Sequence, residues 1–542
     1  MNSGLYGILQ TQKFLPEVVG GADPPGRGAG LAPQEMRVAQ KVRNSCVGVL
    51  KCAWGFSKNS WMQRGVGGRL RTWIASSFQG DARNVSVCKR APLQDKCPGP
   101  VQNLRQGRSR RSDAQKLRVP RRQPDFEVSM VQIDLLAPNA PAPTRAPRAL
   151  WACGFRPFFL VAAIFAVVAV PWWATIFARG LSVATGWSAL SWHGHEMIFG
   201  FALAVIAGFL LTAVQNWTKG VTAQGPWLMA LVALWVAGRV AMSGVWEPGI
   251  LGAILDLSFI PALAVAIGRP LLASKSRRNY KFLGMLGALF ALNLLMHLAS
   301  LGAPVAGERL WLLGALDLVV VMMLVVGGRV IPMFTSNATG VAVRKSAWLD
   351  KALFAFVGLS IVSQIAMGLG AQSLRWVAIL SSALAGVAVI ARMVGWGTRA
   401  ALKVPLLWVL HAGHAWIGVG FMLRATAYLW PQVSSAMATH AITVGAVGML
   451  TLGMMARVAL GHTGRKLQPH RSLGWAFALL GVAALGRTFL PMVAPALLAG
   501  AWPGYYVGFV SFSAALWAVA FLIYAVVYLP VLTRPRVDGR PG

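Results

Sequence analysis

The sequence predicts an all-α fold: a polytopic membrane helix bundle of about twelve transmembrane helices, with both termini in the cytoplasm. Three observations support this prediction: the apolar composition, the number of long apolar runs, and the distribution of basic residues among the loops. Hydrophobic residues make up 56% of the 542 residues and charged residues 12%, and the mean hydropathy is +0.57. Soluble domains carry about 25% charged residues, so this composition excludes an ordinary soluble protein.

The apolar runs give the number of spans. A transmembrane helix needs about 20 predominantly apolar residues, and the chain after residue 150 contains twelve candidate runs. The predicted spans are 157–178, 193–214, 226–243, 250–268, 280–300, 309–331, 348–368, 374–395, 405–425, 436–458, 473–494 and 504–530.

The basic residues of the loops give the orientation. Alternating the twelve spans places 19 Lys and Arg residues on one side of the membrane and three on the other, namely Arg179, Arg309 and Arg375. Cytoplasmic loops are rich in Lys and Arg, so the first side is cytoplasmic. Odd-numbered spans therefore run outward and even-numbered spans run back. A missed or invented span would destroy this asymmetry in every later loop.

The segment 1–129 differs from the remainder of the chain. It holds 22 Lys and Arg against 8 Asp and Glu, and it has no long apolar run. We expect the natural chain to start near Met130, with 1–129 as a basic low-structure segment outside it. A nucleic-acid-binding arm is the alternative, but no motif supports it, so we expect no nucleic-acid partner. The remaining parts are a Pro/Ala-rich cytoplasmic tail (130–150), the transmembrane domain (151–530) and a basic cytoplasmic tail (531–542).

The cysteines exclude several cofactors. Cys153 is the only cysteine of the hydrophobic body, and the other four lie before residue 100. This body therefore has no disulfide framework, no cysteine-ligated iron–sulfur cluster and no haem attached through a CxxCH motif.

Four histidines lie at the predicted outer ends of spans: His193, His195, His297 and His440. Imidazole is a ligand for iron, copper and zinc, so these residues are candidate cofactor ligands. The alternative is that each is an interfacial residue in contact with water. Residues at i and i+2 of a helix point about 200° apart, so His193 and His195 cannot both bind one metal from a regular helix.

Glu196 follows His195 directly and is predicted to share a helix face with His193 at i, i+3. It is a candidate for the carboxylate that orients a ligating imidazole. The alternative is an acidic residue stabilised by the dipole in the first helical turn.

His411 and His414 form an i, i+3 pair inside the predicted span 405–425. A metal, or an axial bond to a non-covalent haem in an apolar pocket, is the functional interpretation. Hydrogen bonding to neighbouring helices is the alternative.

Asp256 and Asp317 are acids within predicted spans, where ionisable residues are usually paired or functional. We expect either an ion pair with a buried Arg or a role in proton handling. Arg239, Arg329 and Arg457 are interpreted as anchors at the inner face, with binding of anionic groups as the alternative.

Several stretches together resemble the NnrS family. They are "GFRPFFL" (154–160), "WHGHEMIFGFALAVIAGFLLTAVQNWT" (192–218), "LWVAGR" (234–239), "GGRVIPMFTSNA" (327–338), "PLLWVLHAGHAWI" (405–417) and "HAITVGAVGMLTLGMMARVALGHTGR" (440–465). The resemblance implies a bacterial inner-membrane protein with non-covalent, b-type haem and copper, a role in tolerating nitric oxide and nitrosative stress, and nitric oxide and membrane lipid as partners. It implies no settled catalytic reaction.

The candidate sites therefore fall into three sets. The cofactor-binding set is His193, His195, His297, His411, His414 and His440. The metal set is His193, His195, His411 and His414. The set for orienting a ligand or handling protons is Glu196, Asp256 and Asp317.

Two other functions fit the same pattern. A twelve-helix secondary transporter is one, for which "GGRVIP" (327–332) is a candidate helix break. A metal-handling accessory factor for a nitric oxide reductase is the other.

Overall fold

The computed structural model describes residues 147–498 and 504–540. Within these residues all regular structure is helical, and eleven helices are long and apolar enough to cross a membrane. This confirms the predicted all-α membrane bundle. The predictions for 1–129, and those for most of 130–150, lie outside the described residues.

The helices follow the predicted spans closely. The first half of the bundle contains α3 (Pro147–Leu150), α4 (Phe155–Arg179), α5 (Ala189–His195), η1 (Glu196–Ala202), α6 (Leu203–Thr218), α7 (Pro226–Ala241), α8 (Gly249–Ala273), η2 (Arg277–Asn279), α9 (Lys281–Ser300) and α10 (Glu308–Thr339). The second half contains α11 (Ala347–Gly368), η3 (Gln372–Leu374), α12 (Arg375–Met393), η4 (Val394–Trp396), α13 (Thr398–Ala401), α14 (Pro405–Leu429), α15 (Ser435–His440), η5 (Ala441–Gly448), α16 (Met449–His462), α17 (Arg471–Leu498) and α18 (Tyr505–Thr533).

Of the twelve predicted spans, the third is the one whose helix in the described residues is shorter than a full crossing. It corresponds to α7, which has 16 residues. At 1.5 Å per residue this helix is about 24 Å long, against a hydrocarbon core of about 30 Å. Two predicted spans each contain a π-helical segment, η1 in the second and η5 in the tenth.

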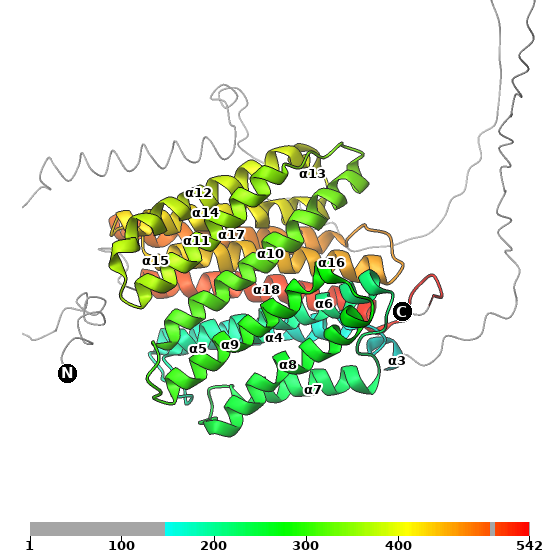
Figure 1. The fold of residues 1–542 in the computed structure, drawn as a ribbon, viewed down its shortest axis with the longest axis horizontal. Helices are drawn as coiled ribbons and strands as arrows, with labels where there is room; N and C mark the ends of the chain where they lie inside the picture. Colours follow the sequence, from blue (N-terminus) through cyan, green and yellow to red (C-terminus); the bar gives the residue numbers. More distant parts are fainter. Residues whose placement is uncertain (1–146, 499–503, 541–542) are drawn as a thin grey trace, which may run out of the picture. The chain divides into compact units, whose positions relative to one another are not determined.

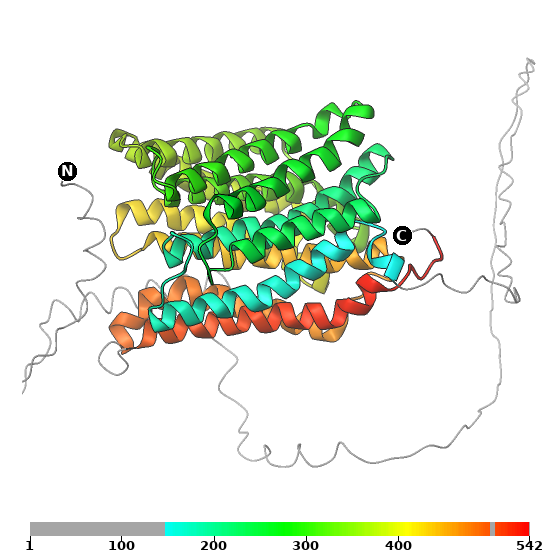
Figure 2. The same cartoon turned by 90° about the horizontal axis from the view of Figure 1, so that it is seen from below.

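The long helices lie side by side along one common direction (Figure 1). Helix α18 packs against both α4 and α17, so the last span lies beside the first (Figure 2). Helices α12 and α14 approach closely because glycine lies at their contact: a Cβ atom at Gly386 would be 2.8 Å from the carbonyl oxygen of Gly418. Small residues of this kind allow membrane helices to pack backbone against backbone.

The candidate helix break at 327–332, which would have supported the transporter alternative, is not present in the structure. Helix α10 runs without interruption over 32 residues from Glu308 to Thr339, with Pro332 inside it. The glycines of this stretch instead allow close approach of neighbouring side chains. Gly327 lies against His414, and Gly328 lies against the guanidinium of Arg392.

The C-terminal end is tied to the first span and to α16. The buried Arg156 donates from Nη1 to the carbonyl oxygens of Leu532 and Arg534, at 2.9 and 2.8 Å. The amide of Val537 donates to the carbonyl oxygen of Thr463 at 3.1 Å.

Candidate functional site

The principal site is a buried polar cluster at the predicted outer end of the first helices. We call His195, Glu196, Arg239, Asp256, Asn293 and His297 the outer cluster. Each of these residues is at most 8% exposed, although they come from five different elements. The sequence folds this way locally because Ser188 caps α5, accepting from the amide of Ser191 at 3.1 Å, and the helix then widens into η1 directly after His195. Single-turn π segments are frequent at functional sites.

The π segment determines the partner of Glu196. Its Oε1 lies 2.9 Å from Nδ1 of His195, and not beside His193 as the i, i+3 spacing predicted. That spacing rule applies to a regular α-helix, whereas the helix changes its register at Glu196. Glu196 therefore orients the imidazole of the adjacent residue.

Asp256 lies at the centre of the outer cluster. Its Oδ2 is 3.2 Å from Nε2 of His195 and 3.0 Å from Nε2 of His297, and it accepts from Nδ2 of Asn293 at 2.8 Å. His195, Asp256 and His297 each offer one potential metal-ligand atom, and these three atoms lie within 4.8 Å of one another. The structure thus brings together two of the predicted cofactor ligands and one predicted acid.

Arg239 joins the two acids of the cluster. It donates from Nη1 to Oε1 of Glu196 at 2.5 Å and from Nη2 to Oδ1 of Asp256. The interpretation of Arg239 as an anchor at the inner face is therefore wrong. Span three runs outward in the predicted topology, and the position of Arg239 near its C-terminal end places it at the outer face. With neutral imidazoles, the two carboxylates and one guanidinium leave the cluster with one net negative charge.

The hydrogen bonds of His195 leave one ring nitrogen without a suitable partner. A carboxylate only accepts, so Nδ1–H must donate to Glu196. In the neutral ring, Nε2 then carries a lone pair. This lone pair faces two oxygen atoms, Oδ2 of Asp256 at 3.2 Å and Oδ1 of Asn293 at 2.9 Å. Turning the Asn293 amide over would only place its oxygen against the Asp256 carboxylate. The site is completed by a proton between Nε2 and these oxygens, carried by His195 or by Asp256, or by a metal ion bound at Nε2.

His193 points away from the outer cluster, consistent with the predicted divergence of i and i+2 residues. Its ring stacks on Trp173 at a centroid distance of 4.0 Å. Together with His440 and Arg487, it lines a cavity that we call the second cavity, to distinguish it from the apolar cavity described below. Nδ1 of His440 donates to the carbonyl oxygen of Ala436 at 2.7 Å.

His411 and His414 lie on one side of α14, and both rings contact Trp396. They differ in their partners. His411 has hydroxyl groups at both ring nitrogens, Thr335 at 2.9 Å and Thr398 at 3.0 Å. His414 is fully buried, and neither ring nitrogen has a hydrogen-bond partner in the described part of the chain.

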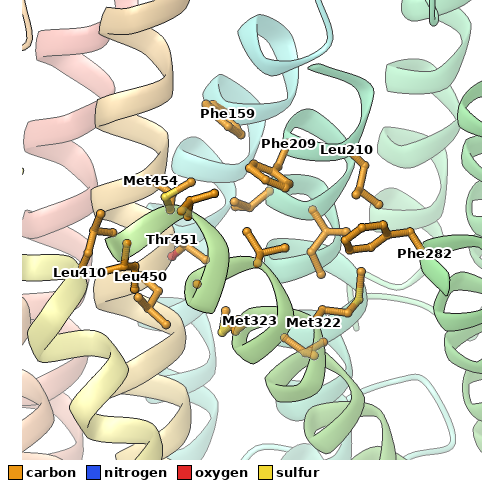
Figure 3. A pocket seen from close by; sticks show the side chains of 17 residues that line it. Phe159, Phe209, Leu210, Phe282, Met322, Met323, Leu410, Leu450, Thr451 and Met454 are labelled. Atoms are coloured by element: carbon orange, nitrogen blue, oxygen red, sulfur yellow. The ribbon is translucent and has the colours of Figure 1, made fainter. Parts of the chain in front are cut away.

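An apolar cavity lies near His414, which does not itself line it. Its walls carry aromatic and thioether side chains, including Phe159, Phe209, Met322 and Met454 (Figure 3). Gly327 also lines it, and a Cβ atom there would be 3.4 Å from Nδ1 of His414. The glycine thus lies next to both the cavity and the unpartnered imidazole.

Asp317 lies apart from these groups in a complete ion pair. Arg424 donates to both of its oxygens, at 2.6 and 3.0 Å, and Gln364 donates to Oδ2 at 3.0 Å. Both acids within the spans are therefore paired with arginine, the first of the two roles expected for them.

Sequence reasoning missed Asn293 and the position of Arg239. Asn293 is a polar residue in an apolar helix, four residues before His297, so the two share a face. That i, i+4 spacing was a signal available in the sequence. Arg239 had no comparable signal, because its partners lie 43 and 17 residues away.

Comparison with known proteins gives one match. The family model described as "NnrS protein" matches residues 149–536, most of the chain. None of the curated proteins compared with the chain matches it.

Proposed function

Because this chain belongs to the NnrS family, we propose that it is a haem- and copper-binding protein of the bacterial inner membrane that acts in the response to nitric oxide. The multi-pass character follows from its eleven apolar helices. The observation that carries the metal part of the proposal is the lone pair of His195 Nε2, which faces two oxygen atoms.

The outer cluster fits copper. His195, His297, Asp256 and Asn293 offer two imidazole nitrogens and two oxygens, and nitrogen and oxygen ligands of this kind suit Cu(II). Glu196 then acts as the carboxylate behind a ligating histidine, fixing the tautomer that leaves Nε2 free. Arg239 holds both carboxylates in place and offsets part of their charge. A copper ion bound here would supply a redox-active centre that can bind nitric oxide.

His414 fits an axial ligand of haem. A buried polar atom without a hydrogen bond costs about 1–3 kcal/mol, and an imidazole bound to iron would satisfy one ring nitrogen. The cavity next to Gly327 has the apolar lining that a non-covalent haem needs. His411 is a weaker candidate because both of its nitrogens already have hydroxyl partners. A haem bound at His414 would supply an iron that binds nitric oxide, which is neutral and can enter from the lipid.

The test is metal analysis and an optical spectrum of the purified protein, with and without nitric oxide. We expect a Soret band that shifts with nitric oxide, and stoichiometric copper. His195→Ala should lose copper and keep the Soret band, while His414→Ala should do the reverse. His470→Ala, an exposed histidine of an inner loop, is the matched control and should change neither. Protein without a Soret band and with only trace copper would refute the proposal.

A further inference from the structure

The second cavity is lined by three hydrogen-bond donors, from Trp173, Arg487 and Trp517, that lack a close acceptor in the described residues. It lies among α4, α5, η1, α15, η5, α17 and α18. We call it the donor pocket, and its polar and aromatic lining is Trp173, His193, His440, Thr443, Arg487, Ser513 and Trp517. The predicted topology places all of these residues in the outer half of the membrane.

Arg487 brings a buried positive charge to the donor pocket. It is 7% exposed, and its Nη2 makes a long hydrogen bond to the hydroxyl of Tyr506 at 3.4 Å. Among the residues that the structure describes, no carboxylate lies within ion-pair distance of it. Three other buried arginines, Arg239, Arg392 and Arg424, have carboxylate partners. Arg156 and Arg457 are buried without one in the described residues, but neither lines this pocket. A buried charge without a counter-charge is strongly destabilising, so an anion bound beside Arg487 would stabilise this part of the fold.

Two tryptophans of the pocket also carry N–H donors that lack an acceptor. The Nε1 atoms of Trp173 and Trp517 are both buried without a hydrogen-bond partner in the described residues. An indole N–H can only donate, so neither group can be satisfied by another donor. The hydroxyls of Thr443 and Ser513 are already committed as donors, to the carbonyl oxygens of Thr439 at 3.0 Å and Ala483 at 3.1 Å.

We propose that the donor pocket binds a small monovalent oxyanion of the nitrate and nitrite class. Such an ion accepts hydrogen bonds at several oxygens, and its plane matches the planar fork of a guanidinium. One arginine supplies one positive charge, which favours a monovalent anion over a phosphate dianion. The same charge argues against the metal ion predicted at His193, because Arg487 would repel it. No residue of the outer cluster lines this pocket, so the proposal does not rest on haem or copper.

The test is isothermal titration of the purified full-length protein with sodium nitrate, at constant ionic strength. Sodium nitrite, chloride and phosphate are titrated in parallel. We expect saturable binding of nitrate and nitrite, and weaker binding of chloride and phosphate. Arg487→Gln should weaken nitrate binding about tenfold or more, since it removes the charge. Arg309→Gln, at an exposed outer position, is the matched control and should bind nitrate as the wild type does.

A second variant guards against a folding defect in Arg487→Gln. Trp517→Phe keeps an aromatic ring in place and removes the N–H donor, so it should weaken nitrate binding about 10- to 100-fold, the worth of one hydrogen bond to a charged group. Absence of saturable nitrate binding by the wild type would overturn the proposal. So would unchanged nitrate binding by both variants, or chloride or phosphate binding as tightly as nitrate.

Discussion

Replacing Glu196 by Gln changes one atom and tests the role assigned to the outer cluster. The carboxylate accepts from Nδ1 of His195 at 2.9 Å and from Arg239 at 2.5 Å. Both contacts use the same oxygen, Oε1, so a glutamine keeps its amide oxygen at this position and accepts as a neutral group. The negative charge behind the imidazole is lost, which weakens His195 as a metal ligand.

The expected magnitude follows from these two contacts. Loss of the carboxylate behind a ligating histidine lowers metal affinity about 10- to 100-fold, which corresponds to about 1.4–2.8 kcal/mol. Removing one partner of a buried ion pair destabilises the fold by about 3–5 kcal/mol. Arg239 keeps Asp256 as a partner, so we expect the lower end of that range.

The assay is the copper dissociation constant, measured by competition with a chelator of known affinity, beside thermal unfolding of the same samples. Asp317→Asn is the matched control, because it removes a carboxylate from the buried pair with Arg424 outside the outer cluster. We expect both variants to lose stability and only Glu196→Gln to lose copper affinity. Unchanged copper affinity in Glu196→Gln, or an equal loss in Asp317→Asn, would refute the reasoning.

Three further predictions concern haem, packing and the C-terminal tail. His414→Ala should abolish the Soret band, and His411→Ala should retain it because His411 already has two hydroxyl partners; equal spectra of the two variants would contradict this. Gly386→Ala should lower the free energy of unfolding by about 1–3 kcal/mol through overpacking against Gly418, whereas Gly358→Ala, with no atom within 4 Å of the added Cβ, should have little effect in the same denaturant titration. The hydrogen bond from Arg536 lowers the pKa of the exposed Asp538 to about 2. The stabilisation of the C-terminal tail by ionised Asp538 is therefore complete above about pH 4 and disappears as the pH falls through the lowered pKa. Amide hydrogen exchange at Val537 should speed up over that window, and a flat exchange profile, after correction for intrinsic rates, would contradict the assignment.

The membrane fold was predictable from the sequence because hydropathy and loop charge are local properties. Each predicted span has a helical counterpart within a few residues, and the opposite directions of His193 and His195 agree with helix periodicity. The partner of Glu196 was not predictable, because the change to a π-helix at that residue alters which side chains share a face.

The composition of the sites depended on contacts between distant segments. Asn293 reaches His195 across 98 residues, and Arg424 reaches Asp317 across 107. The two histidines of α14 looked equivalent in sequence. Only the positions of Thr335 and Thr398 show that His411 is satisfied and His414 is not.

X-ray absorption at the copper edge identifies the ligands of copper bound in the outer cluster. For protein purified with its bound copper, we expect a first shell of nitrogen and oxygen, with the outer-shell scattering of two imidazole rings from His195 and His297. Loss of one of these imidazole contributions in His297→Ala, with the rest of the spectrum retained, would complete the assignment. A first shell containing sulfur, or a spectrum unchanged in both His195→Ala and His297→Ala, would contradict it.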